Sequence, residues 1–309
     1  MSADARPVLL LGSANMERLL QGALDDRFDK IVAGQGPTDR EAEAVAMLTV
    51  GYDRVDAAML HGLPRLKVIA VPGAGYERID VSAAQARGVR VMNAGAVHAG
   101  DVADHAVALA LAAIQRLPEQ QAWVRDDKWR GGFPQRRRAV SAERFGIVGL
   151  GAIGTKVGDR LAPFGGQIAW WGPNPKPARW PRKASLTELA RWCTTLIVAV
   201  RGDAAGLIDT AVIEAVGPDG IIVNIARGVV IDEDALIAAL KDGRLGYAAL
   251  DVFAQEPTPP ARWDGVPHVI LTPHSAGLTH QAMARLRDAA VQNLLVALGE
   301  GGPINEISA

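Results

Sequence analysis

The sequence is poor in cysteine: Cys193 is the only one among 309 residues, so no internal disulfide can form. A lone thiol fits a reducing compartment, and we expect Cys193 to be a buried, small apolar residue of a cytoplasmic protein. The sequence also lacks the run of ~18 apolar residues that a membrane-spanning helix needs, and residues 1–13 show no signal-peptide pattern. These absences predict a protein that does not enter a membrane.

The sequence also has no marked excess of positive or negative residues. The 33 basic residues stand against 34 acidic ones, which leaves a net charge of -1. This balance does not favour a nucleic acid or an anionic membrane surface as a partner. The six histidines match no metal-binding spacing, so we expect no metal site.

What the sequence does contain is a regular alternation of short apolar runs with amphipathic segments of helical length. This alternation predicts βαβ units, in which a parallel sheet carries helices on both faces. A long helical stretch covers residues 100–129, where we expect Pro118 to break the helix after Leu117. The alternation occurs in two halves, so we predict two doubly wound α/β domains. Strands are expected to begin at Val8, Val45, Leu66 and Val89, and then at Arg144, Gln167, Thr195, Gly220, Ala248 and His268.

A glycine pattern, Gly149-x-Gly151-x-x-Gly154, directly follows a predicted strand and opens a predicted helix. In this setting the first glycine permits a tight turn, the second lets the backbone approach a pyrophosphate, and the third lets helix and strand pack closely. The free N–H groups and the positive end of the helix dipole then hold the anion. The pattern predicts a dinucleotide site, and packing glycines without a ligand are the alternative.

The next strand ends without the carboxylate that commonly binds the ribose 2′-hydroxyl of NAD. Gly172 stands at that end, and no Asp or Glu occurs in residues 165–185. An acid would repel a 2′-phosphate, whereas an amide and a cation can bind it. We therefore favour NADP(H) over NAD(H), with a solvated loop whose cations touch nothing as the alternative. The polar residues of the loop are Asn174, Lys176, Arg179, Arg182 and Lys183.

Polar side chains follow three later strands, at the carboxyl ends where doubly wound folds bind ligands. Arg227 follows "IIVNIA", Asp251 and Glu256 follow the strand at Ala248, and His274 follows "VILTP". An Arg can fork onto the carboxylate of a 2-oxo acid, and a protonated His can donate to its carbonyl oxygen. A Glu beside the His stabilises the charged ring. Each residue alone could be an ordinary surface or loop residue; together they predict a 2-oxoacid reductase.

At this point the chain resembles the D-isomer-specific 2-hydroxyacid dehydrogenase family over nearly its whole length. The resemblance rests on "VPGAGYERID", "GDVADHAVALALA", "GIVGLGAIG", "NIARGVVIDEDALIAALKDGRLGYAALDVFAQEP" and "LTPHSAG". It implies a discontinuous, flavodoxin-like substrate domain, residues 1–97 plus 279–309, and a central Rossmann nucleotide-binding domain, residues 98–278. It also implies that Arg227, Glu256 and His274 are the catalytic set.

Further site residues are implied by the same resemblance. Backbone N–H groups of Gly73, Ala74 and Gly75 would hold the substrate carboxylate together with Arg227 and His274, and Asp251 would lie near the nicotinamide carboxamide. The remaining cofactor-binding residues would be Ala152, Ile153, Ala226 and Gly277, beside Gly149, Gly151, Gly154, Gly172, Asn174 and Lys176.

Within the family, "KWRGGFP" and the acid-free second strand look most like the glyoxylate, hydroxypyruvate and hydroxyphenylpyruvate reductases, which often use NADPH. The resemblance implies a homodimer, and in some relatives an aromatic side chain in the region of residues 129–133 reaches the partner's active site. Two departures are Ala205, where the family often has Thr, and the turn "GPNPKP". The alternatives are an NAD(H)-linked dehydrogenase of another substrate, a relative acting on formate or phosphite, and a nucleotide-sensing corepressor-like protein. We expect His105 to be packed or solvated.

Overall fold

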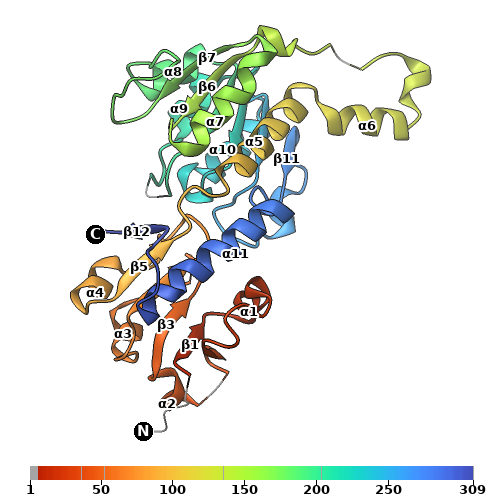
Figure 1. Ribbon diagram of the computed structural model, residues 1–309. Coiled ribbons are helices and arrows are strands. Elements are labelled where there is room, and N and C mark those ends of the chain that lie inside the picture. The colour runs from red at the N-terminus through yellow and green to blue at the C-terminus, as the bar shows by residue number, and fades with distance from the viewer. Residues whose placement is uncertain (1–5, 36, 52, 135, 203, 309) are drawn as a thin grey trace. The chain divides into compact units, whose positions relative to one another are not determined.

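The computed structural model describes residues 6–35, 37–51, 53–134, 136–202 and 204–308. The chain divides into two compact units, which we call unit 1 (Met1–His98 with Thr279–Ala309) and unit 2 (Ala99–Leu278). Each unit is a sheet of mainly parallel strands with helices packed on both faces, which confirms the predicted fold class (Figure 1).

Unit 1 has a six-stranded sheet in the order β12-β5-β4-β3-β1-β2. From β2 to β5 this is the flavodoxin-like order 2-1-3-4-5, and all these strands are parallel. One side of the sheet packs against α3 and α4, and the other packs against α1 and α11. The elements are β1 Val8–Leu11, α1 Ala14–Leu20, β2 Asp29–Val32, α2 Thr38–Glu41, β3 Ala44–Leu48, α3 Ala57–His61, β4 Val68–Val71, α4 Val81–Ala86, β5 Arg90–Asn93, α11 His280–Leu295, η6 Val296–Leu298 and β12 Asn305–Ile307.

The edge strands β2 and β12 are not predicted by the sequence analysis. All four residues of β2 are half-buried, and β12 has two exposed residues among its three. β12 also pairs antiparallel with β5, unlike the rest of the sheet. Short edge strands of this kind carry little of the continuous apolar character that identifies buried parallel strands.

Unit 2 has a six-stranded parallel sheet in the order β11-β10-β9-β8-β6-β7. A parallel bridge between Trp170 and Arg182 lies beside β7, where a third strand would stand. Counting this bridge, the strands follow the Rossmann order 3-2-1-4-5-6 with β11 added. The elements are α5 Ala99–Ile114, α6 Leu117–Arg125, η1 Lys128–Gly131, η2 Val140–Ala142, β6 Arg144–Val148, α7 Ala152–Leu161, η3 Ala162–Phe164, β7 Gln167–Trp171, α8 Leu186–Trp192, β8 Thr195–Val198, α9 Thr210–Val216, β9 Ile221–Asn224, η4 Gly228–Val230, α10 Glu233–Lys241, β10 Tyr247–Leu250, η5 Pro260–Trp263 and β11 Val269–Leu271.

Successive residues of the unit 2 strands face opposite cores, as the period of two in a strand requires. In β8, Leu196 and Val198 pack against α8, α9 and α10, whereas Ile197 packs against α5 and α7. Cys193 is buried in the first of these cores, as predicted, and burial raises the pKa of its thiol to about 12. The two apolar faces hold the sheet in place, so the carboxyl ends of its strands form a fixed edge.

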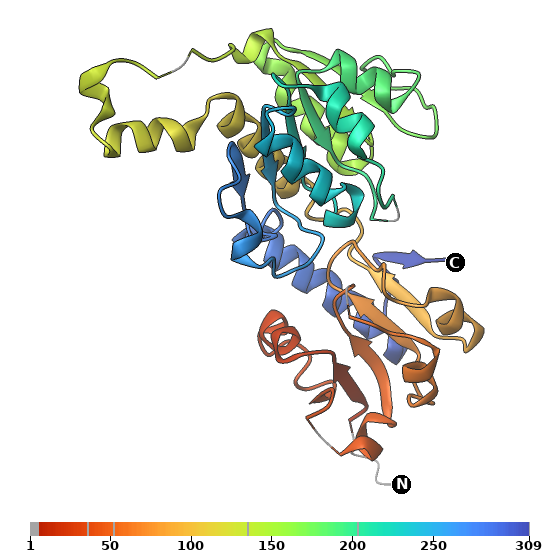
Figure 2. The same cartoon turned by 180° about the vertical axis from the view of Figure 1, so that it is seen from behind.

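The predicted long helix of residues 100–129 is broken before Leu117, not after it. α5 ends at Ile114, Arg116 has a left-handed backbone with φ 47°, and Pro118 lies in the first turn of α6. A proline is tolerated there because the first-turn N–H groups have no partner within the helix. All nine residues of α6 are described and none is buried. In both Figure 1 and Figure 2, α6 and the segment after it project away from the sheet of unit 2.

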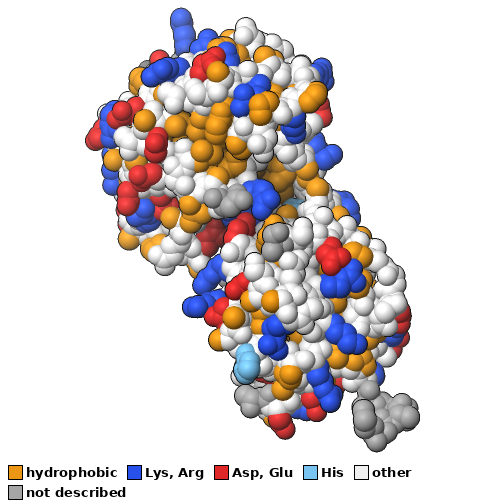
Figure 3. All heavy atoms as spheres, turned by 90° about the vertical axis from the view of Figure 1, so that its left-hand side faces the viewer, with side chains coloured by type: hydrophobic (Ala, Val, Ile, Leu, Met, Phe, Trp, Pro, Cys, Tyr) orange, Lys and Arg blue, Asp and Glu red, His pale blue; other side chains and the backbone are white. Residues whose placement is uncertain are grey.

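None of the helices formed by the described residues combines the length and apolar character that crossing a membrane requires. Side chains of both charge signs are interspersed over the face of the molecule drawn in Figure 3.

Candidate active site

The glycine turn between β6 and α7 has the geometry that its sequence predicts. Gly149 has φ +90°, and a Cβ there would lie 2.8 Å from the carbonyl oxygen of Ala199. A Cβ on Gly154 would lie 2.0 Å from the carbonyl oxygen of Gly149, so helix and turn approach as closely as glycine allows. At Gly151, in contrast, a Cβ would meet open space. Gly149 and Gly154 therefore serve close packing, and Gly151 leaves the backbone accessible.

The start of α7 fits the pyrophosphate of a dinucleotide. The helix begins at Ala152 with Gly151 as its N-cap, and no described side chain caps it. By comparison, Ser185, Asp209 and Asp232 cap α8, α9 and α10 by accepting from main-chain N–H groups. Uncapped N–H groups at an exposed helix start are the donors that bind phosphate oxygens. Ala152 is exposed and Ile153 is half-buried against the core.

The loop after β7 is held in place by tryptophans. The indole ring of Trp180 lies over Gly158 of α7, where a Cβ would come within 2.5 Å of the ring. The Nε1 of Trp170 donates to the carbonyl oxygen of Trp180 at 3.1 Å. Gly172 is buried at the end of β7, and its carbonyl oxygen accepts from Arg182 at 2.7 Å. The residues that would meet the adenosine ribose therefore sit on a fixed loop.

The alternative of a loop whose cations touch nothing is wrong. Lys176 donates through Nζ to the carbonyl oxygen of Leu150, inside the glycine turn. Arg179 pairs with Asp159 of α7 at 3.8 Å, and Lys183 pairs with Glu188 at 3.6 Å. An ammonium has three donors, so Lys176 keeps others for an anion at the turn. Asn174 is exposed in the same loop.

The segment after β9 places Arg227 at the carboxyl edge of the sheet. Buried Asn224 accepts from the N–H of Ala226 at 3.0 Å and donates to the carbonyl oxygen of Arg227 at 3.0 Å, which fixes the turn. Arg227 is half-buried, and its Nη1 donates to the carbonyl oxygen of Ala226 at 2.8 Å. A Cβ on Gly228 would lie 1.8 Å from the main chain of Phe253, so this segment packs directly on the one after β10.

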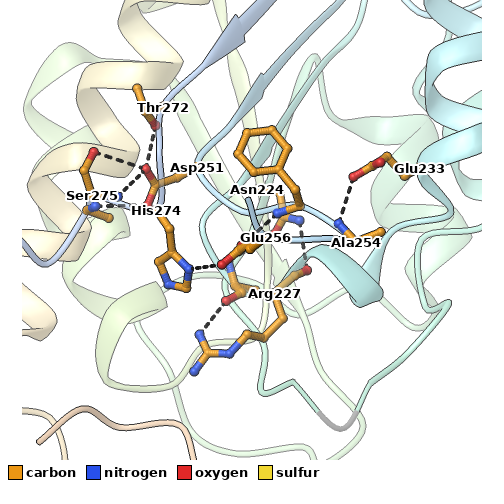
Figure 4. Close-up of polar contacts among 12 residues, drawn as sticks. Asn224, Arg227, Glu233, Asp251, Ala254, Glu256, Thr272, His274 and Ser275 are labelled. Carbon is orange, nitrogen blue, oxygen red and sulfur yellow. Dashed lines mark hydrogen bonds and ion pairs between the residues drawn. The ribbon is translucent and has the colours of Figure 1, made fainter. Parts of the chain in front are cut away.

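Glu256 and His274 form an ion pair on the segments that follow β10 and β11. The Nδ1 of His274 lies 2.6 Å from Oε2 of Glu256, and Oε1 of Glu256 accepts from the N–H of Phe253 at 3.0 Å. A carboxylate only accepts hydrogen bonds, so Nδ1 carries the proton in this pair. Figure 4 shows the ring of His274 and the guanidinium of Arg227 extending to the same side of Glu256.

The environment of Glu256 favours its ionised form. Partial burial alone would raise the pKa of this carboxyl group, but the hydrogen bonds from His274 and from the Phe253 N–H outweigh it. The charges of His274 and Arg227 act in the same direction, so the pKa of Glu256 lies below its ordinary value. Glu256 is therefore a carboxylate at neutral pH.

Asp251 fixes the loop that carries His274. Its side chain is 1% exposed and accepts from the N–H of Ser275 and of Ala276, both at 2.9 Å, and from the hydroxyl of Thr272 at 2.6 Å. Its carbonyl oxygen accepts from the N–H of His274 at 2.8 Å. Burial alone would raise the pKa of Asp251, but the hydrogen bonds from its neighbours lower it below the ordinary value. Its proximity to a nicotinamide carboxamide stays a prediction.

His105 of α5 joins this cluster, which the sequence analysis does not predict. Its Nε2 lies 3.1 Å from the hydroxyl oxygen of Thr272 and 3.4 Å from Oδ1 of Asp251. The side chain is packed, as expected, with 25% of its surface exposed, and it also contacts these two polar groups. His105 and Thr272 are 167 residues apart in the sequence, so no local pattern links them.

His274 itself has a left-handed backbone, with φ 50°. A non-glycine residue in this region is strained by on the order of 1–3 kcal/mol and persists only where its surroundings over-determine it. The three main-chain N–H groups bound by Asp251 provide that determination. With this backbone conformation, Nδ1 of the ring lies 2.6 Å from Oε2 of Glu256.

The remaining predicted residues lie as follows. Ala226 is 5% exposed next to Arg227, and Gly277 is half-buried in a turn in which the N–H of Leu278 donates to Ser275. Gly73, Ala74 and Gly75 belong to unit 1, just after β4. There the side chain of Asn93 donates to the carbonyl oxygen of Ala74 at 2.6 Å. The described residues contain no group of three or more His, Cys, Asp or Glu that could hold a metal ion.

Comparison with known proteins gives this arrangement its context. Residues 107–276 match the family described as "D-isomer specific 2-hydroxyacid dehydrogenase, NAD binding domain". The chain is 35% identical to the 2-ketogluconate reductase of Gluconobacter oxydans over 80% of this chain and 81% of that one. It is 34% identical to the hydroxyphenylpyruvate reductase of Plectranthus scutellarioides over 90% of this chain and 92% of that one.

A similar solved structure is the NADPH-dependent glyoxylate/hydroxypyruvate reductase of Sinorhizobium meliloti, in complex with NADP and malonate. The TM-score is 0.89 with 29% identity, over 98% of this chain and 97% of that one.

Proposed function

The chain belongs to the D-isomer-specific 2-hydroxyacid dehydrogenase family, and from this premise we propose that it reduces a small 2-oxo acid to the D-2-hydroxy acid with NADPH. Family membership makes the protein an NAD(P)-dependent oxidoreductase. The proposed substrates are glyoxylate, hydroxypyruvate or an aryl pyruvate. The observation that carries the proposal is the His274–Glu256 pair, 2.6 Å apart beside Arg227.

His274 is the proton donor of this reaction. Its Nδ1–H is engaged with Glu256, so the second ring nitrogen, Nε2, is the one that donates to the carbonyl oxygen of the substrate. The nicotinamide cofactor, when bound, supplies the hydride that reduces the carbonyl carbon. In the direction of oxidation the same nitrogen, now neutral, accepts the proton of the hydroxyl group. Glu256 stabilises the charged ring and fixes its orientation.

Arg227 selects for a carboxylate next to the reacting carbonyl. Its guanidinium has five N–H donors in a planar fork, and Nη1 donates to the carbonyl oxygen of Ala226. A planar fork of this kind matches the two oxygens of a carboxylate. The main-chain N–H groups of Gly73, Ala74 and Gly75 are proposed as further donors to that carboxylate.

The preference for NADPH rests on the loop after β7. Gly172 brings no negative charge to the end of the strand, Asn174 is exposed, and Lys176 lies against the glycine turn. These residues suit a 2′-phosphate, which carries up to two negative charges. The Sinorhizobium meliloti relative is described as NADPH-dependent, which supports the same choice.

A steady-state comparison of NADPH and NADH with glyoxylate, hydroxypyruvate and phenylpyruvate tests the proposal, with the configuration of the product determined on a chiral column. We expect turnover with at least one of these acids, a D-product and a larger kcat/KM for NADPH. Turnover that favours a ketone without a carboxylate would contradict the role of Arg227. A larger kcat/KM for NADH would contradict the cofactor preference alone.

We also propose that the protein is a cytoplasmic homodimer. α6 and the segment after it expose apolar side chains, among them Trp129 at 62% and Phe133 at 86%. Trp123, Trp129, Phe133 and Arg137 are among the residues that line a hollow of about 800 Å³ in this region. Exposed apolar surface of this kind is typical of an interface. Analytical ultracentrifugation measures the state directly, and a monomer at micromolar concentration would contradict it.

A further inference from the structure

The segment that carries Glu256, residues 252–263, is fastened by a buried carboxylate that the reaction does not use. Glu233, the first residue of α10, is 7% exposed. Its Oε2 accepts from the main-chain N–H of Ala254 at 2.9 Å, and its Oε1 accepts from Nε of Arg262. One side chain from a neighbouring helix therefore binds both ends of this segment.

A buried carboxylate is costly unless it is paired and hydrogen-bonded. Here both oxygens have donors, and Arg262 is held in turn by Asp234, which accepts from Nη2 at 2.8 Å. The arrangement is specific in geometry because Arg262 contacts two adjacent acids with different nitrogens. Burying the charges of Glu233 and Arg262 costs desolvation free energy, so the ion pair by itself adds little stability. Its role is better explained by the segment that it positions.

A continuous set of contacts leads from Glu233 to His274. Glu233 binds Ala254, the neighbouring Phe253 donates its N–H to Oε1 of Glu256, and Oε2 of Glu256 binds His274. Figure 4 shows Glu233 and His274 on opposite sides of this segment. A shift of the main chain at residues 253–254 would therefore move Glu256 relative to the ring.

We propose that Glu233, together with Arg262, is a positioning residue that fixes the main chain at Ala254 so that Glu256 meets His274. The inference rests on the proposed function for its catalytic consequence. Loosening the Glu233 contact weakens the support that Glu256 gives to the protonated ring. Two other charged groups lie near the pair: Arg227, whose charge acts on Glu256, and Asp251, whose carboxylate accepts from the N–H of Ser275 next to His274.

The experiment compares Glu233→Gln with the wild type and with Glu256→Gln. A glutamine at 233 can still accept from the Ala254 N–H, but it loses the charge that pairs with Arg262. The first readout is the pH midpoint of the His274 ring titration, followed by NMR and assigned with His274→Gln. The second is kcat and KM for 2-oxoacid reduction as a function of pH. Glu214→Gln is the control, because Glu214 forms an exposed ion pair with Arg244 elsewhere in unit 2.

We expect Glu233→Gln to move the midpoint to lower pH and to lower kcat roughly 3- to 30-fold with a smaller change in KM, since small displacements of a reacting group are costly. In the Glu256→Gln background the same substitution should leave the midpoint unchanged, because the coupling it supports is already gone. Arg262→Lys serves as a second variant if Glu233→Gln fails to fold. It keeps the positive charge but not the planar guanidinium that contacts both Glu233 and Asp234, and we expect a smaller shift of the midpoint.

An unmoved midpoint, or an equal shift in the Glu256→Gln background, would overturn the inference and leave Glu233 a structural residue. The ring titration needs no turnover, so it decides the role of Glu233 even if the 2-oxo acids prove not to be substrates. In that case the proposed function alone would fail.

Discussion

Replacing Glu256 by glutamine removes one negative charge next to His274 while keeping the size of the side chain. Reduction requires a protonated ring, so the reductive rate falls as the pH rises through the titration of His274. The pKa of Glu256 lies below its ordinary value, so the carboxylate stays ionised at neutral and alkaline pH. Its loss destabilises the protonated ring, and the falling limb of the rate profile should move to lower pH.

The size of the shift follows from the geometry. Nδ1 and Oε2 are 2.6 Å apart, which places the two charge centres roughly 4 Å apart, where the interaction is worth about 1 kcal/mol in water and about 4 kcal/mol near a protein surface. The side chains of His274 and Glu256 are 40% and 33% exposed, so solvent screens the pair considerably. An interaction on the order of 1 kcal/mol remains, which is enough to move the falling limb measurably to lower pH.

The assay is kcat for reduction of the best 2-oxo acid from about pH 5 to pH 10, at saturating cofactor, for wild type and variant. Cofactor dissociation constants and thermal midpoints, measured alongside, separate the charge effect from a loss of structure. A variant with a lower kcat at every pH but an unmoved falling limb would refute the reasoning, because Glu256 would then act by some means other than its charge.

Three substitutions test single site residues in the same assay. His274→Gln should lower kcat by about 10²–10⁴ with little change in cofactor binding, and near-normal turnover would remove His274 from its role. Arg227→Ala should lower kcat/KM for 2-oxo acids at least tenfold, but not for a ketone without a carboxylate, since only the carboxylate uses the fork. Gly172→Asp should lower the NADPH-to-NADH ratio of kcat/KM at least tenfold; Gly172→Ala is its control, because a Cβ there lies 3.2 Å from the Trp170 ring. A fourth, Asp251→Asn, should lower the free energy of unfolding at pH 7 by roughly 2–4 kcal/mol, measured by urea titration, because Asn cannot accept as Asp251 does. The pKa of Asp251 is lowered in the folded protein, so its stabilisation is present above pH 3.8 and is lost as the pH falls through the folded value. The difference in free energy of unfolding between Asp251→Asn and the wild type should therefore decrease at acid pH. An increase there would contradict the stabilising role of the Asp251 carboxylate.

Features that depend on neighbouring residues could be read from the sequence. The glycine turn is local: its three glycines, the strand before it and the helix after it lie within about a dozen residues, and the structure places them as predicted. The α/β fold class follows from the alternation of apolar runs, which is also a local property. The predicted residues at the carboxyl ends of β9, β10 and β11 lie together because parallel neighbours end at one edge.

Other features give no signal in the sequence around them and could not be predicted from it. The contacts of His105 with Thr272 and of Arg138 with the carbonyl oxygen of Asp219 become visible only when the strand order is known. The break before Leu117 depends on the left-handed backbone of Arg116, a residue without any turn signal. Glu233 looks like an ordinary acid in the first turn of a helix, and its burial comes from a segment some twenty residues later.

The left-handed backbone of His274 sets the stability of the fold against the proposed catalytic role of this residue. A glycine would adopt φ 50° without strain, yet it would remove the ring that meets Glu256. Selection for a more stable protein would therefore favour a substitution here that removes the proposed proton donor. A chain of the same fold with glycine at this position would gain stability and lack the proposed proton donor.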